Sequence, residues 1–257
     1  MQLDVSELRE FYLTPLGRIA RQIVSSELRS IWPSASAEHF VGLGHATPYL
    51  RPFLGEAERV IALMPAAEGV LHWPPEGPNL TALTFEEDLP LADNSVDKLL
   101  LIHLLEATRD PSELLEEVWR VLMPTGRVVV VVPYRSGAWA RADHTPFGIG
   151  RPFSRFQLTQ LLENASLSPL QTRRFLSMPP SNRRIILGST RGWERLGRRL
   201  LPRFAGLLAI EAEKVMVRGI QVPTKARSLK IKVPGLAPAP SPKPATFMRG
   251  TEEPFSD

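Results

Sequence analysis

A few titratable side chains in this chain could transfer protons. His103 and Glu106 directly follow an apolar run that predicts a buried strand at residues 98–102, and His144 lies in a loop rich in Gly, Arg and aromatic residues. Histidine ionises near neutral pH, so His103 or His144 could act as a general base toward an oxygen or nitrogen acceptor. The alternative for His103 and Glu106 is that they begin a short helix, with Glu106 bonding backbone donors, and the pattern favours this alternative.

The composition excludes several other kinds of reactive site. The 257 residues include no cysteine, which excludes disulfides, thiolate zinc sites and a cysteine nucleophile. Histidines and carboxylates show no metal-ligand spacing, so we expect no metal. The first residues are acidic where a signal peptide would be basic, and every apolar run is shorter than the roughly 18 residues of a membrane span. We therefore expect a cytoplasmic protein without a membrane span.

The positive charge of the chain is unevenly placed. The net charge is +4, and most of the excess lies after Val222, so a generally basic surface for nucleic acid is poorly supported. The arginines at 191–203 have the spacing of a solvated helix face. From residue 221 to residue 257 the chain is rich in proline and predicts a disordered basic tail.

The elements that must position the candidate residues alternate between helical and extended patterns. Residues 6–31 predict one or two helices, broken near Pro15, and residues 46–55 predict a short helical stretch. Further helices are predicted at 110–124, with Asp110 as the N-cap, at 154–167, and at 191–201. Strands are predicted at 38–44, 59–64, 80–83, 98–102, 127–133, 168–179 and 206–220. The alternation predicts an α/β fold, a doubly wound and mostly parallel sheet whose final strand is antiparallel.

The segment at residues 87–133 carries an ordered set of short motifs. They are LP at 89–90, NSVD at 94–97, LE at 105–106, DP at 110–111, RVL at 120–122, PTG at 124–126 and VP at 132–133. In this order they resemble class I S-adenosylmethionine-dependent methyltransferases of the type-11 group. A weaker resemblance extends from about residue 11 to residue 217. The whole chain most resembles a methyltransferase-like subgroup associated with alphaproteobacteria, in which an ATPYLRPF-type loop replaces the glycine-rich one.

The resemblance implies a Rossmann-like sheet of seven strands and S-adenosylmethionine as the cofactor. It also implies three parts, namely an N-terminal helical segment at 1–35 packed on the core, a methyltransferase-like domain at 36–220 and the tail at 221–257. The positions that match the family's cofactor contacts are Gly42, Gly44, Ala46, Met64, Glu86, Glu87, Asp88, Leu89, Leu101 and Ile102.

Two departures from the family affect these contacts. Gly42 stands where the family has an acid on the first strand, and Ala46 and Pro48 replace the second and third glycines of the loop. At the end of the second strand Leu63 or Met64 replaces the acid that holds the cofactor's ribose hydroxyls, unless Glu68 reaches back. Losing that contact would cost about 1–3 kcal/mol of binding free energy.

The loop around His144 matches the region where the family often builds its acceptor pocket. Phe147, Arg151 and Phe153 could form an aromatic and basic lid over an anionic acceptor, or the loop could be packed for folding alone. His45, inside the altered loop, could contact a ligand or face solvent.

The leading hypothesis is an S-adenosylmethionine-dependent methyltransferase for a small-molecule acceptor. The alternative is a degenerate, non-catalytic methyltransferase-like protein that binds a partner through the remodelled loop or the basic tail. An RNA methyltransferase is disfavoured, because LIHLLE stands where an NPPY-type motif for flipped-base methylation would follow the fourth strand.

Overall fold

The computed structural model describes residues 4–36, 38–183, 192–194 and 205–216. These residues belong to one unit of the fold, Met1–Gly219. A second unit, Ile220–Asp257, lies outside the described residues, and so does the predicted tail. The predicted basic helix at 191–201 lies outside them as well, apart from residues 192–194.

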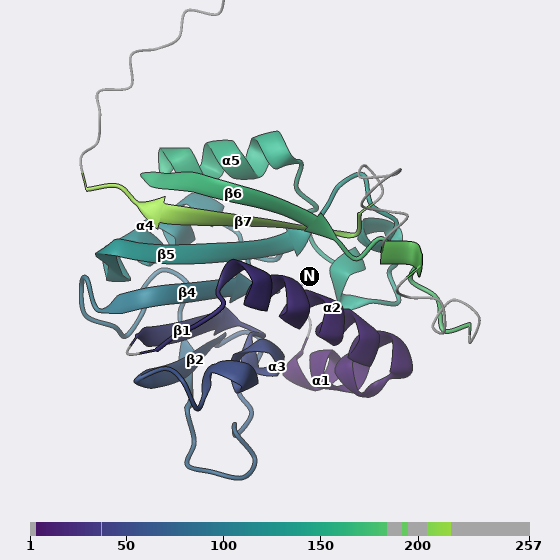
Figure 1. Ribbon diagram of the computed structural model, residues 1–257, viewed down its shortest axis with the longest axis horizontal. Helices are drawn as coiled ribbons and strands as arrows, with labels where there is room; N and C mark the ends of the chain where they lie inside the picture. The colour runs from purple at the N-terminus through teal and green to yellow at the C-terminus, as the bar shows by residue number, and fades with distance from the viewer. Residues whose placement is uncertain (1–3, 37, 184–191, 195–204, 217–257) are drawn as a thin grey trace, which may run out of the picture. The chain divides into compact units, whose positions relative to one another are not determined.

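The fold is a seven-stranded sheet with helices on both faces (Figure 1). The strands are β1 (His39–Gly44), β2 (Arg59–Pro65), β3 (Thr81–Thr84), β4 (Val96–Ile102), β5 (Leu122–Pro133), β6 (Leu167–Phe175) and β7 (Leu207–Lys214). Their spatial order is β3-β2-β1-β4-β5-β7-β6. The first five strands are parallel, and β7 runs antiparallel to both β5 and β6. The predicted fold class, with its antiparallel final strand, is confirmed.

The four longer helices of the described residues begin at residues whose side chains accept hydrogen bonds from free backbone N–H groups. The helices are α1 (Val5–Leu13), α2 (Pro15–Ile31), α3 (Thr47–Leu50), α4 (Pro111–Val121) and α5 (Arg155–Asn164), with 3-10 turns η1 (Arg51–Phe53), η2 (Trp139–Arg141) and η3 (Pro146–Gly148). Asp110 caps α4 by accepting from the N–H groups of Ser112 and Glu113. Thr14 ends α1 and caps α2, so the predicted break near Pro15 is present.

The predicted helix at 110–124 is three residues too long. The structure ends α4 at Val121 and starts β5 at Leu122, which pairs with Val96 of β4. Pro124 disfavours the helical conformation in the residue before it, and an extended backbone there can join the sheet.

Side chains alternate along the central strands and divide the core between the two faces of the sheet. Ile102 of β4 faces α2 and α3, whereas Leu101 beside it faces α4 and α5. In Figure 1, α2 crosses the near face of the sheet and α4 lies behind it. This burial on both faces explains the continuous valine run of β5.

The end of β7 is tied to the turn before β4. The buried Lys214 donates from Nζ to Oδ1 of Asn94 at 2.6 Å and to the carbonyl of Leu122 at 2.7 Å. Its ammonium group lies 4.2 Å from the ring centroid of Trp119. Within the described residues, no helix is long and apolar enough to cross a membrane.

Candidate functional site

The carboxyl ends of β1, β2, β3 and β4 meet at one edge of the sheet. Ligands of doubly wound sheets bind at this edge, in the crevice where the strand order reverses on either side of the first strand. The sheet order places that reversal between β1 and β4. The predicted cofactor contacts all come from these four strands or the turns that follow them, so their surroundings show what the edge can hold.

The loop after β1 folds back onto its own strand. A Cβ atom at Gly42 would lie 2.6 Å from Cβ of Ala46 and 2.6 Å from Cδ1 of Leu50. Gly44 has a φ of 83°, and a Cβ there would lie 2.3 Å from the carbonyl oxygen of Ile102. Gly42 and Gly44 therefore have no room for a side chain, and α3 occupies the space beside Gly42 where the family places an acid.

Aromatic and imidazole rings from four segments fill the space above the ends of β1 and β4. The hydroxyl of Tyr12, from α1, lies 2.6 Å from Nε2 of His103 and 2.5 Å from the hydroxyl of Tyr49. His45 stacks on Tyr12 with 5.7 Å between ring centroids, and Phe147 lies 4.6 Å from His103. We call these five side chains the ring cluster.

Burial keeps the histidines of the ring cluster neutral. Desolvation lowers the pKa of His45 to about 4 and holds the pKa of His103 well below its usual value. His103 also has a left-handed backbone, with φ of 59°, which is uncommon for a residue with a side chain. A neutral His103 has one ring nitrogen that can accept a proton. Its Nε2 already shares a hydrogen bond with the hydroxyl of Tyr12.

Two buried carboxyl groups lie beside the ring cluster. Oε1 of Glu106 is 3.7 Å from Nδ1 of His103, and Oε2 of Glu106 has no hydrogen-bond partner in the described part of the chain. The pKa of both Glu68 and Glu106 is raised to about 8, mainly by desolvation, and for Glu68 the nearby Glu106 and Glu86 contribute to this rise. The backbone carbonyl of Glu68 accepts from the N–H of Val5 at 2.9 Å, which anchors the start of α1.

An open cavity of about 430 Å³ lies at the ends of β2 and β3. Glu86 and Glu87 line it together with Ala66, Ala67 and Arg109. This is the side of the edge where the resemblance places the adenine of the cofactor. Of the ten predicted contacts, Glu86 and Glu87 line this cavity.

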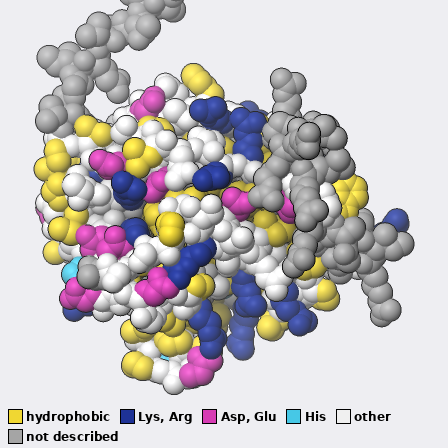
Figure 2. Space-filling view, in the orientation of Figure 1, with side chains coloured by type: hydrophobic (Ala, Val, Ile, Leu, Met, Phe, Trp, Pro, Cys, Tyr) yellow, Lys and Arg dark blue, Asp and Glu magenta, His cyan; other side chains and the backbone are white. Residues whose placement is uncertain are grey.

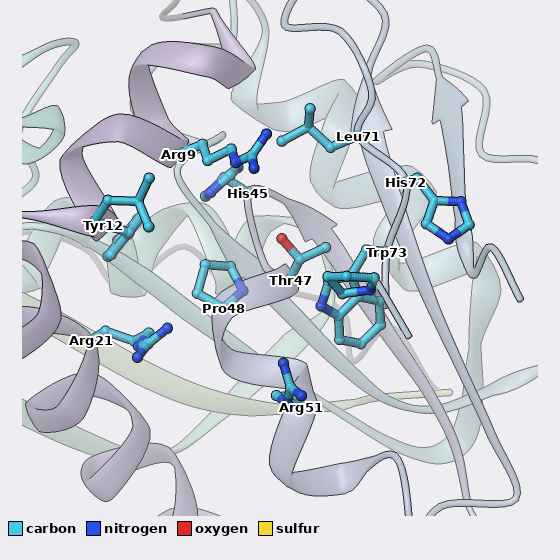
Figure 3. Close-up of a pocket in the computed structure, with 12 residues that line it drawn as sticks. Arg9, Tyr12, Arg21, His45, Thr47, Pro48, Arg51, Leu71, His72 and Trp73 are labelled. Carbon is cyan, nitrogen blue, oxygen red and sulfur yellow. The ribbon is translucent and has the colours of Figure 1, made fainter. Parts of the chain in front are cut away.

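A larger cavity of about 570 Å³ lies between α1, α2, α3 and residues 71–75. Arg9, Arg21 and Arg51 line it, and we call it the basic cavity. In Figure 3, Arg9 and Arg21 lie on one side and Leu71 and Trp73 on the other, with Thr47 and Pro48 between them. His45 and Tyr12 belong both to this lining and to the ring cluster.

The other predicted contacts are mostly core residues. Ala46, Met64, Leu89, Leu101 and Ile102 are all buried, and Leu101 and Ile102 face opposite sides of the sheet. Asp88 is exposed and forms an isolated bridge with Phe85.

The loop predicted as a lid is bound to the rest of the protein. Phe147 belongs to the ring cluster, Phe153 is buried in the core, and Arg151 donates to the carbonyl of Thr108 at 3.3 Å. His144 is exposed, with Nε2 3.0 Å from the carbonyl oxygen of Pro180, and lines neither cavity. Within the described residues, no group of three or more His, Asp or Glu side chains could hold a metal ion.

Sequence reasoning missed the residues that α1 and α2 bring to this edge. Tyr12 of the ring cluster and Arg9 and Arg21 of the basic cavity lie in segments whose pattern indicates only amphipathic helices. The one available signal was the ATPYLRPF loop, because it contributes Tyr49 and Arg51.

Comparisons with known proteins agree with the geometry of the sheet. Residues 41–130 match a family model described as a methyltransferase domain, from β1 into β5. No curated protein matches the chain significantly.

Solved structures of low sequence identity share the fold. A possible histamine N-methyltransferase from Thermotoga maritima matches with 18% identity, a TM-score of 0.58, and coverage of 82% of this chain and 95% of its own. For a methyltransferase from Archaeoglobus fulgidus the identity is 17%, the TM-score 0.54, and the coverage 76% and 94%. For 1,6-didemethyltoxoflavin-N1-methyltransferase from Burkholderia thailandensis, solved with S-adenosylhomocysteine, the values are 16%, 0.51, 82% and 85%. The chain thus has the fold of S-adenosylmethionine-dependent methyltransferases.

Proposed function

We propose that this protein is an S-adenosylmethionine-dependent methyltransferase that acts on a small-molecule acceptor when α1 is withdrawn from the edge of the sheet. The observation that carries the proposal is the open cavity at the ends of β2 and β3, with Glu86 and Glu87 in its lining. It lies on the methyltransferase-type sheet at the place expected for adenosine. The match to a methyltransferase-domain model over the same strands supports this assignment.

The side chains above the ends of β1 and β4 leave no room for the methionine half of the cofactor. Tyr12, His45 and His103 fill the space above the ends of β1 and β4. The space that remains beside His103, Glu68 and Glu106 is about 20 Å³, which is room for about one water molecule. Binding of the whole cofactor therefore requires α1, which carries Tyr12, to move.

The need for α1 to move lowers the apparent affinity of the protein for the cofactor. When only a fraction of the molecules is open, the measured dissociation constant is the intrinsic one divided by that fraction. The absence of an acid at Gly42 and at Met64 weakens binding further. We therefore expect weak binding by the wild type and tighter binding by a variant in which α1 packs less well.

Calorimetric titration with S-adenosylmethionine and S-adenosylhomocysteine tests the proposal. Tyr12→Ala removes the side chain that α1 inserts into the ring cluster, and we expect it to tighten binding about tenfold. Glu10→Ala, an exposed position on the same helix, is the matched control and should bind like the wild type. If neither the wild type nor Tyr12→Ala binds either compound while both remain folded, the methyltransferase proposal is wrong.

The packing of Tyr12 favours a second candidate, the non-catalytic protein that binds a partner. In that case the ring cluster is a permanent part of the core and α1 never withdraws. Failure of Tyr12→Ala to bind the cofactor, together with a loss of stability typical of a core truncation, is the outcome that this candidate predicts.

A further inference from the structure

Within the described residues, the lining of the basic cavity contains arginine side chains and no acidic side chain. Arg9 comes from α1, Arg21 from α2 and Arg51 from η1, so three separate elements bring guanidinium groups to one cavity. Figure 2 shows Lys and Arg side chains gathered over α1, α2 and α3 on this face. An anion entering the cavity would be attracted by Arg9 and Arg21, whereas Glu76 offsets the charge of Arg51.

Two of the three arginines are available to a ligand. Arg51 donates to Oε1 of Glu76 at 2.7 Å, and both side chains are more than 60% exposed. Arg9 and Arg21 make no hydrogen bond or ion pair with another side chain in the ranges that the structure describes. A guanidinium group presents several donors in a plane that matches the oxygens of a carboxylate or phosphate.

A buried and unpartnered nitrogen supplies an independent indication of a ligand. His45 lines the cavity, is 3% exposed, and has no hydrogen-bond partner at Nδ1 within the described residues. Buried polar atoms in proteins are nearly always hydrogen-bonded, and a bound water, ion or ligand is one way in which an exception is completed. A ligand in the basic cavity would lie against this imidazole.

The opposite wall of the cavity is apolar. Leu71 and Trp73 lie there, and Trp73 is 8% exposed. A volume of about 570 Å³ is within the range of small-molecule sites. We propose that the basic cavity binds a small organic anion, with a carboxylate or phosphate held by Arg9 and Arg21 and an apolar or aromatic body against Trp73.

This proposal does not rest on the proposed methyl transfer, although both involve α1, which carries Arg9 and Tyr12. The basic cavity shares no lining residue with the cavity at the ends of β2 and β3. Loss of cofactor binding and loss of anion binding can therefore be observed separately in one protein preparation.

The test uses simple probes on the full chain. Benzoate carries a carboxylate on a phenyl ring, and phenyl phosphate carries a phosphate on a phenyl ring. Benzyl alcohol has the ring without the charge, and inorganic phosphate has the charge without the ring. Binding is followed by calorimetry and by the indole N–H signal of Trp73 in a ¹H–¹⁵N spectrum, identified with Trp73→Phe. We expect benzoate, phenyl phosphate or both to bind and to shift this signal, and benzyl alcohol to do neither.

Charge-removing variants locate the site. Arg9→Gln and Arg21→Gln should each weaken binding of the anionic probe about tenfold, the effect of losing one charge-assisted hydrogen bond. Arg18→Gln, an exposed arginine of α2 outside the cavity lining, should bind within about twofold of the wild type. Glu76→Gln should tighten binding about twofold, because it releases Arg51.

Three results would overturn the proposal. The first is that neither benzoate nor phenyl phosphate binds. The second is that they bind without shifting the Trp73 signal, or with equal affinity to the wild type and to both arginine variants. The third is that inorganic phosphate binds as tightly as phenyl phosphate, which would show that the apolar wall plays no part. Because all the substituted arginines are exposed, the variants are expected to fold, and circular dichroism checks this.

Discussion

Gly42→Ala should destabilise the protein, because α3 packs directly against β1 at this residue. The new Cβ would lie 2.6 Å from Cβ of Ala46, which cannot rotate away, and 2.6 Å from Cδ1 of Leu50, which is fully buried. Overpacking of this kind costs about 1–3 kcal/mol. Replacing glycine also reduces the entropy of the unfolded chain, which stabilises by about 0.4–1 kcal/mol. The steric cost is the larger of the two, so the free energy of unfolding should fall.

Gly55→Ala is the matched control for this experiment. A Cβ at Gly55 meets no atom within 4 Å, so only the entropy gain remains and the variant should be as stable as the wild type or slightly more so. Urea denaturation should place the two variants about 1–3 kcal/mol apart, and each kcal/mol corresponds to about 2–4 °C in Tm for a chain of this size.

A double variant tests the named contact itself. Ala46→Gly removes one of the two clashing atoms, so adding it to Gly42→Ala should cost less than Ala46→Gly costs in the wild type. If Gly42→Ala is as stable as Gly55→Ala, then α3 does not occupy the space beside β1 and our account of the altered loop is wrong. The same packing implies that Gly42→Asp, which introduces the acid that the resemblance implies at this position, requires α3 to move.

The remaining predictions concern the ring cluster, the buried acids and the end of β7. Tyr12→Phe removes the hydroxyl shared by His103 and Tyr49 and should cost about 1–3 kcal/mol of unfolding free energy, whereas loss of less than 0.5 kcal/mol would show that these hydrogen bonds are not formed. Glu106 has a folded pKa of about 8, above its ordinary 4.5, so its contribution is full at low pH and is lost as pH rises toward 8. Glu68, whose pKa is also raised to about 8, contributes in the same way, and the low pKa of His45 has the opposite effect only between about 4 and 6.5. Stability should therefore fall between pH 6.5 and 8, and Glu106→Gln should reduce this fall while exposed Glu116→Gln leaves it unchanged. Lys214→Met keeps the buried stem but leaves the carbonyl of Leu122 without its donor, so thermal denaturation should show a loss of about 1–3 kcal/mol.

Local features of the fold could be predicted from the sequence because neighbouring residues produce them. The cap at Asp110, the break between α1 and α2 and the short α3 each depend on residues within a few positions of one another. The valine run of β5 and the alternation of elements were enough for the doubly wound sheet. The end of α4 was misplaced, because the pairing of Leu122 with Val96 depends on a strand 26 positions earlier in the chain.

The site could be predicted only in part, for the same physical reason. Glu86 and Glu87 line a cavity at the sheet edge, where the ends of parallel strands meet, and their contact with a cofactor stays a prediction. The contact of Tyr12 with His103 joins residues 91 positions apart, and no periodicity in either segment indicates it. The basic cavity likewise depends on how α1 and α2 dock, so its arginines could not be distinguished from ordinary surface residues of an amphipathic helix.

The position of α1 over the sheet edge also orders events during translation. Tyr12 emerges from the ribosome 91 residues before His103, and at about 5–20 residues per second this interval is about 5–18 s. Phe11 and Leu8, which are buried in the finished protein, therefore stay exposed on the nascent chain during this interval. The helix made first completes its contacts only after β4 and the Phe147 loop exist, so the part of the protein that covers the candidate site is made early and buried late.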